Sequence, residues 1–297
     1  MSASDQNPRK GLLYALSCYL IWGLFPIYWY PLNHSAMPAM QIMAHRVLWS
    51  AVFALILVCR FRQLPALFSV FRTPKLLAAF ACTSLLIGTN WLVYVWSVTN
   101  NHVLDASLGY FINPMFNIFL GATILKERLG RTQWLAVALA LTGIVWLAVP
   151  AGQIPWIALI LAFSFGMYGL IRKLVPTDTL TGMTVETLIL LPAALAYLTW
   201  CAVDGQTVFG GLNTLQTAVL LGSGAATTLT LMLFTAAAKH ISLSLVGILQ
   251  YISPSIQLLC GLLLFGEQLN GNRLIGYMWV WLGVAVFLWD AWRRKAV

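Results

Sequence analysis

Charged residues are scarce in this sequence. Only 8% of its 297 residues are charged and only eight are Asp or Glu, whereas ordinary globular domains have about 25% charged residues. Hydrophobic residues make up 60% of the chain and the mean hydropathy is +0.83. No polar stretch between the apolar ones is long enough to hold a soluble domain. A chain of this composition is predicted to lie in a lipid bilayer.

Several motifs are missing as well, and each absence argues against a class of function. The sequence has no GxxxxGK[ST] loop for ATP hydrolysis, no HExxH or GxSxG, and no carboxylate pair spaced for catalysis on one helix. It also lacks the loop of an ion selectivity filter. The five cysteines lie in or beside apolar stretches without a CxxC, which indicates neither a zinc site nor disulfides. We therefore expect no enzyme activity, no metal and no cofactor.

The sequence does contain ten long apolar stretches, separated by Pro, Gly and charged residues. About 20 mainly apolar residues suffice to cross the hydrocarbon core as a helix. The polar N-terminus runs into the first stretch without a small-residue cleavage site, so we expect this stretch to be retained. The predicted spans are 11–30, 38–59, 75–98, 104–125, 133–149, 155–172, 183–202, 214–237, 243–265 and 274–292.

The basic residues support this count of ten. Cytoplasmic loops of membrane proteins are enriched in Lys and Arg. With the N-terminus inside, fifteen of the seventeen basic residues fall in predicted inner segments, and Arg273 is the single one in an outer loop. The net charge of +9 therefore indicates topology and gives no reason to expect nucleic acid. We predict an all-α protein of the bacterial inner membrane with both termini in the cytoplasm.

The chain is internally duplicated. A shift of 140 residues superposes five identical pairs: Pro114 on Pro254, Gly121 on Gly261, Glu127 on Glu267, Leu129 on Leu269, and Gly143 on Gly283. Five spans separate equivalent positions, and because five is odd, the two halves must be inverted. We predict two five-helix repeats, 1–150 and 151–297. Inverted repeats are common in secondary transporters, whose substrate site lies where the halves meet; a stable bundle without transport is the alternative.

Polar residues recur at equivalent places in the two halves. Tyr110, Asn113 and Asn117 share one face of the span 104–125, and the 140-residue shift places Gln250, Ser253 and Gln257 at the same positions of 243–265. Such groups cannot face lipid without partners. They either bond neighbouring helices or line a central pathway.

Ionisable residues inside the spans are the strongest indication of a site, because a charge in the bilayer needs water or a partner. Arg46 lies within the second span, and Asp105 is its nearest expected partner by depth. Its neighbour His45 titrates near neutral pH and could carry a coupling proton, or it could form a structural hydrogen bond. Glu186 is either a substrate or proton site or a partner of the basic residues Arg172 or Lys173.

Aromatic residues are abundant, with 13 Trp in the chain. Some, in particular Trp29, Trp200 and Trp292, are expected at the membrane interface. Those in the middle of spans could instead form a cavity for amphipathic or cationic compounds, because ring faces attract cations and bury apolar groups. Packing in the core is the alternative for each of them. This set contains Trp22, Trp91, Tyr94 and Tyr168, with Asn90 beside them.

Several segments resemble the RarD branch of the EamA family, within the drug/metabolite transporter superfamily. They are AHRVLWS at 44–50, the stretch 90–96 from Asn90-Trp91 to Trp96, SLGYFINP at 107–114, YGLIRK at 168–173 and LQYISP at 249–254. The resemblance covers nearly the whole chain. It implies a ten-helix permease of two inverted halves that works by alternating access. Two departures are Gln41 and Asp105, where the family pattern leads us to expect Glu.

The hypothesis is a secondary transporter that moves a small organic solute, metabolite or drug across the inner membrane, with protons as a possible coupling ion. Arg46 would attract an anionic group and the aromatic residues would hold the apolar part. The alternatives are a non-transporting scaffold or regulatory subunit, and a flippase for lipid-linked carriers. The predicted substrate-binding residues are Trp22, His45, Arg46, Asn90, Trp91, Tyr94, Tyr110, Asn113, Tyr168, Glu186, Gln250, Tyr251, Ser253 and Gln257.

Overall fold

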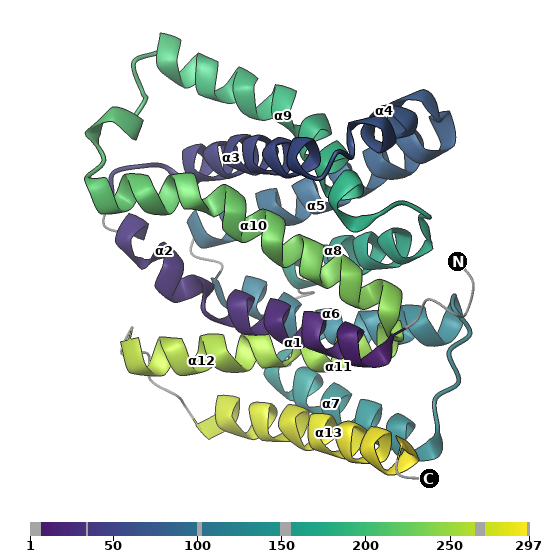
Figure 1. Ribbon diagram of the computed structural model, residues 1–297. Coiled ribbons are helices and arrows are strands. Elements are labelled where there is room, and N and C mark those ends of the chain that lie inside the picture. Colours follow the sequence, from purple (N-terminus) through teal and green to yellow (C-terminus); the bar gives the residue numbers. More distant parts are fainter. Residues whose placement is uncertain (1–6, 34, 100–102, 149–155, 265–270, 296–297) are drawn as a thin grey trace.

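The computed structural model describes residues 7–33, 35–99, 103–148, 156–264 and 271–295, and within them the regular structure is helical throughout. Figure 1 shows a bundle in which the N- and C-termini lie at the same end. We call this the terminal end, and the other the opposite end. The α-helices are α1 (Pro8–Gly23), α2 (Phe25–Asn33), α3 (Ala39–Arg60), α4 (Leu64–Arg72), α5 (Pro74–Thr99), α6 (Val103–Thr123), α7 (Arg131–Ala148), α8 (Trp156–Leu174), α9 (Thr179–Val203), α10 (Thr214–His240), α11 (Leu243–Gln250), α12 (Ile252–Leu264) and α13 (Gly271–Lys295), with a 3-10 turn, η3 (Phe209–Gly211).

Each of the ten predicted spans coincides with helical structure, although two of them are broken. Within the described residues, seven stretches are long and apolar enough to cross a membrane, and Arg131–Leu147 and Leu274–Asp290 are shorter apolar helices. The chain is therefore a multi-pass membrane protein, as its composition predicts. The count of ten spans and the orientation of the termini stay predictions.

The two broken spans divide near prolines. Pro26 has no N–H to donate to the carbonyl of Trp22, four residues earlier, and the chain breaks at Leu24 between α1 and α2. The side chain of Gln257 replaces the missing donor, since its Nε2 donates to Trp22 O at 3.1 Å. In the same way Pro254 removes the donor for the carbonyl of Gln250, beside the break at Tyr251 between α11 and α12.

Side-chain caps fix several helix starts. Asn7 accepts from Lys10 N before α1, Asp178 accepts from Leu180 N and Thr181 N before α9, and Ser242 accepts from Leu245 N before α11. Asn213 and Gln216 form a reciprocal capping box at α10. These bonds satisfy backbone donors that have no partner inside the helix.

The two halves of the sequence interlock. In the first half, α1 packs on α10 and α12, α3 on α9 and α10, α6 on α8 and α11, and α7 on α13. Helices that start 140 residues apart run antiparallel: Gly143 lies against Gly276, and Gly283 against Ala136, where α7 crosses α13. The pair α6 and α11 has the same arrangement, with Gly121 against Ser244 and Pro114 against Gly247. The halves thus share one core.

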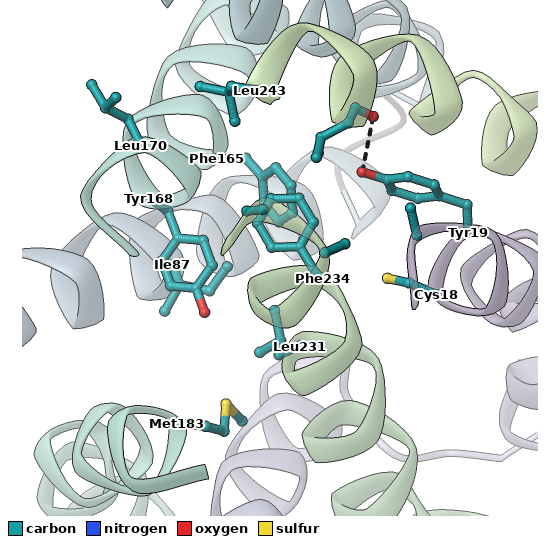
Figure 2. Close-up of a cluster of buried hydrophobic side chains, with 14 of the residues drawn as sticks. Cys18, Tyr19, Ile87, Phe165, Tyr168, Leu170, Met183, Leu231, Phe234 and Leu243 are labelled. Atoms are coloured by element: carbon teal, nitrogen blue, oxygen red, sulfur yellow. Dashed lines mark hydrogen bonds between the residues drawn. The ribbon is translucent and has the colours of Figure 1, made fainter. Parts of the chain in front are cut away.

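The largest buried cluster fills the centre of the bundle (Figure 2). Phe165 and Tyr168 of α8 meet Phe234 of α10, with ring centroids 4.8 and 6.1 Å away. Tyr19 of α1 donates from its hydroxyl to Val246 O of α11 at 3.1 Å. This aromatic core separates the terminal end from the middle of the bundle.

Candidate functional site

Arg46 lies in the middle of α3, where the two halves meet. Its Nε donates to Thr227 Oγ1 of α10 at 2.7 Å, and its guanidinium carbon lies 4.6 Å from the centroid of the Trp91 ring of α5. Thr227 takes one of the five N–H donors of the guanidinium. Within the described part of the chain the other four donate no hydrogen bond, and no carboxylate forms an ion pair with Arg46. Asp105, its predicted partner, lies in α6, and its side chain is outside the described residues.

Aromatic rings surround this guanidinium. The rings of Phe25 and Trp29 lie 6.0 Å from its carbon. Tyr94 and Tyr110 are close enough to interact with its charge, and their rings meet at 5.7 Å, edge to face. The Arg46 site comprises Phe25, Trp29, Arg46, Trp91, Tyr94, Tyr110 and Thr227.

This grouping brings together Arg46, Trp91, Tyr94 and Tyr110 from the predicted set. Sequence reasoning missed Phe25 and Thr227, and it assigned Trp29 to the interfacial belt. The break at Leu24 explains the two aromatics, because it starts a second helix and gives Phe25 and Trp29 a new direction. A cation inside an aromatic enclosure, with four donors that bond none of the described residues, can bind an anionic group attached to an apolar body.

The loop between α9 and α10 covers α3 toward the opposite end. Gln41 Nε2 donates to Gln206 O at 2.6 Å, and Val208 N donates to Gln41 Oε1 at 3.3 Å. One turn along α3 the imidazole of His45 stacks on Phe209, with ring centroids 4.9 Å apart. His45 Nδ1 has no hydrogen-bond partner among the described residues. The structural hydrogen bond that was one alternative for His45 is therefore not formed at this nitrogen.

A group of packed aromatic rings lies on the other side of the Arg46 site, toward the terminal end. Trp22 of α1 packs on Phe165 and Phe234 at 5.5 and 5.8 Å between ring centroids, and Tyr168 completes the group. Phe234 is seven residues beyond Thr227 on α10, which corresponds to about 10 Å along a helix. We call Trp22, Phe165, Tyr168 and Phe234 the aromatic cluster.

Glu186 lies in a buried polar group that adjoins the aromatic cluster on the side of the terminal end. Tyr168 donates from its hydroxyl to Glu186 Oε2 at 3.2 Å, and Arg172 Nε lies 3.6 Å from Glu186 Oε1. The two charged side chains are 0% and 2% exposed. Of the two basic partners considered, Arg172 is the one that pairs, because Lys173 donates instead to the carbonyls of Ala238 and Ile241, each at 2.6 Å.

The predicted polar stripes form bonds between helices. Asn117 Nδ2 donates to Gln250 Oε1 at 2.9 Å, and Tyr251 donates from its hydroxyl to Phe111 O at 3.2 Å. Gln257 Nε2 lies 3.3 Å from Ser253 Oγ in addition to its bond to Trp22 O.

Two other asparagines differ in their bonding. Asn90 Nδ2 donates to Leu161 O and Ser164 Oγ of α8 at 2.9 and 3.0 Å, as interhelical packing requires. The Oδ1 of Asn113 is buried without a hydrogen-bond partner among the described residues. The predicted residues thus divide among the Arg46 site, the aromatic cluster, the Glu186 group and the bonded stripes, and His45, Asn90 and Asn113 lie outside these groups. Their part in substrate binding stays a prediction.

Two grooves lie apart from the Arg46 site. One, of about 440 Å³, lies between α5 and α8 beside Leu85 and Phe163, and the other, of about 330 Å³, lies between α12 and α13 beside Ile256 and Trp281. Both are almost wholly apolar, as expected where lipid chains contact the bundle. Among the described residues no group of three His, Cys, Asp or Glu side chains could hold a metal ion.

The comparisons with known proteins agree with this architecture. The model of the EamA-like transporter family matches residues 9–149 and again residues 154–289. The chain belongs to the EamA-like transporter family. It is 43% identical to an uncharacterized transporter of Pseudomonas aeruginosa (97% of this chain, 96% of the relative) and 42% identical to the protein RarD of Escherichia coli (96% of each).

A solved structure adds support for the fold alone. One crystal structure superposes with a TM-score of 0.70 over 96% of this chain and 98% of its own, at 18% sequence identity. The resemblance to RarD across nearly the whole chain is thus confirmed, and the protein is a membrane transporter of this family. Membership of this family argues against an enzyme.

Proposed function

We propose that the chain is a secondary transporter of the bacterial inner membrane that moves a small organic solute by alternating access. The proposal includes ten spans in two inverted halves, 1–150 and 151–297. The Arg46 site supports it most directly, because a cation from one half is bonded to Thr227 of the other inside an aromatic enclosure. A solute bound there would touch both halves, as a midplane site requires.

The solute class follows from the chemistry of the Arg46 site. The guanidinium donors that bond none of the described residues fit a carboxylate or another planar anion, and the rings of Trp91, Tyr94 and Tyr110 fit an apolar or aromatic body. We therefore propose an amphipathic organic anion or zwitterion as substrate.

Two contacts would have to open in turn during transport. Phe209 and Gln41 close the Arg46 site toward the opposite end, and the aromatic cluster closes it toward the terminal end. Opening the first while the second stays closed would expose the site to one side of the membrane only.

Binding to purified protein tests the site assignment. Aromatic amino acids, aryl carboxylates and an amphipathic cation are titrated while tryptophan fluorescence is recorded, and flux of any binder is measured in liposomes. We expect Arg46→Ala to abolish binding of the anionic compounds, and Arg131→Ala, which removes an exposed arginine, to leave it unchanged. Unchanged affinity in Arg46→Ala would refute the assignment. A purified protein without flux but with a stoichiometric partner would favour the scaffold alternative.

We further propose a proton as the coupling ion, carried by Glu186. Protonation would neutralise the carboxylate that faces Arg172 and Tyr168, and so would release a bond between α8 and α9. In liposomes with an imposed pH gradient, Glu186→Gln should exchange substrate at equilibrium but no longer accumulate it. If His45→Gln rather than Glu186→Gln uncouples transport, the proton belongs to His45.

A further inference from the structure

The short helix α4, at the terminal end of the bundle, has no role in the proposed transport mechanism. It connects α3 and α5 and packs on α5 and α9. Leu67 and Val70 are its buried residues, and they join a cluster with Val58, Phe80 and Leu180. One face of α4 therefore belongs to the protein core.

A second face of α4 is also apolar but has no protein partner in the core. Leu64, Phe68 and Phe71 follow i, i+4, i+7 spacing and thus share a side of the helix. Phe68 is 57% exposed, and Phe61, just before α4, is 61% exposed. Large aromatic side chains at the end of a membrane-spanning bundle are expected to lie in the interface between headgroups and acyl chains.

The charges around this face have a single sign. Arg60, Arg62, Arg72 and Lys75 flank the two ends of α4 and are all exposed. The sequence contains no Asp or Glu from residue 6 to residue 104. Among the described residues none of these four cations forms an ion pair. The whole segment is therefore an amphipathic surface whose cations have no counterion among the described residues.

We infer that α4 and its flanking cations form a binding site for anionic phospholipid in the leaflet at the terminal end. Phe61, Phe68 and Phe71 would enter the acyl boundary, while the four cations bind lipid phosphates. Charge complementarity selects this occupant, because zwitterionic lipid would leave the positive charge uncompensated. The same helix packs on the start of α9, through Leu180 and through the contact between Thr181 Oγ1 and Gln63 Oε1, so bound lipid would stabilise the end of the bundle that contains the Glu186 group.

Fluorescence quenching tests this inference without any assumption about transport. Phe68→Trp is introduced into the otherwise native protein, and both proteins are placed in nanodiscs. The tryptophan fluorescence of the native protein is subtracted from that of Phe68→Trp, which leaves the signal of the new tryptophan on α4. Brominated phosphatidylglycerol, mixed at a low fraction into phosphatidylcholine, should quench this signal much more than brominated phosphatidylcholine at the same fraction. Equal quenching by both lipids would overturn the inference, since it would indicate ordinary lipid contact.

A matched pair of charge variants identifies the residues responsible. The variant R60Q/R62Q/R72Q/K75Q should lose the preference for phosphatidylglycerol. Because four cations are removed, its apparent affinity for this lipid should fall by at least about tenfold. The variant R9Q/K126Q/R128Q/R131Q removes the same charge from exposed positions at the same end and should keep the preference. Equal losses in both variants would mean a general electrostatic effect and no site at α4. Inorganic phosphate should not compete, and competition by it would likewise exclude a lipid site.

Discussion

The buried pair of Arg172 and Glu186 should respond unequally to loss of either partner. Removing one member of a buried ion pair leaves an unpaired charge and costs about 3–5 kcal/mol. A carboxylate can neutralise itself by binding a proton, whereas a guanidinium cannot. We therefore expect Glu186→Leu to lower the unfolding temperature in detergent more than Arg172→Met does.

The double variant Arg172→Met/Glu186→Leu is the matching control. Because it leaves no buried charge, it should be more stable than Glu186→Leu alone, with a coupling energy well above the error of the measurement. Additive losses in the double variant would show that the two side chains do not act as a pair.

Gly182 makes room for the guanidinium of Arg172, one turn before Glu186 on α9. A Cβ at this position would overlap Arg172 Cζ and both of its terminal nitrogens. Gly182→Ala should therefore displace the guanidinium from Glu186 and destabilise the fold by about 1–3 kcal/mol, as overpacking does. In an Arg172→Met background the same substitution should cost little. Gly271→Ala, where no atom of the described residues lies within 4 Å, is the control that should leave the unfolding temperature unchanged.

At the scale of single residues the sequence predicts chemistry better than partners. Buried charge is expensive, and this indicated Arg46 and Glu186 without any structure. It did not indicate Thr227, because one threonine among many in apolar helices has no pattern that distinguishes it. The pairing of Glu186 with Arg172 was open for a similar reason: spacing along two helices does not fix which side chains face each other across them.

At the scale of elements, Glu127 caps a helix of the other half. It follows α6, and its carboxylate accepts from Leu243 N at 2.7 Å, from Ser244 N at 3.0 Å and from Ser244 Oγ at 2.6 Å, at the start of α11. Gly121 leaves the space for this carboxylate, since a Cβ there would lie 2.5 Å from Glu127 Oε2. Gly121 and Glu127 are both among the pairs repeated after 140 residues. In the first half they act together, because Gly121 makes room for the carboxylate with which Glu127 caps α11. Glu267, the counterpart of Glu127, lies outside the described residues.

Removing this cap should destabilise the contact between the halves. We expect Glu127→Ala to cost about 1–2 kcal/mol, the upper range for a helix N-cap, and Glu127→Gln to cost less because it keeps one acceptor. Hydrogen exchange measured by mass spectrometry should increase at residues 243–246 in Glu127→Ala, with no change at the start of α9, which Asp178 caps. Unchanged exchange at α11 would contradict the role assigned to Glu127.

Hydrophobicity predicts where long helices are, but not where they break or where a short helix lies between them. The ten apolar stretches match the helices closely because lipid leaves the backbone few alternatives. The breaks at Leu24 and Tyr251 were not predicted, since a proline inside a span can also be accommodated by a kink. Helix α4 lies between the predicted spans 38–59 and 75–98 and was not predicted, because nine residues are too few to span and the apolar face is visible only with helical spacing.

At the scale of the whole molecule, the interlocked halves should not fold separately. Helices α1, α3 and α6 pack chiefly on helices of the second half, so a fragment containing residues 1–153 would expose most of its buried surface. We expect each fragment, 1–153 or 154–297, to be degraded when expressed alone, and the two to form a stable complex when co-expressed. A folded, monodisperse 1–153 fragment would show instead that the first half is an independent domain.

Inversion of the halves is testable at positions 140 residues apart. α7 and α13 begin at Arg131 and Gly271, both exposed, and the two helices run antiparallel. If the repeats are inverted, these equivalent positions lie on opposite sides of the membrane. In a variant without the five native cysteines, Gly271→Cys should react with a membrane-impermeant maleimide in intact cells, and Arg131→Cys only after the membrane is opened. Ser69→Cys in α4 should behave like Arg131→Cys, because both lie at the terminal end where we place the cytoplasm. Labelling of 131 and 271 from the same side would exclude the inverted arrangement, and labelling of 131 alone in intact cells would keep it but reverse the orientation.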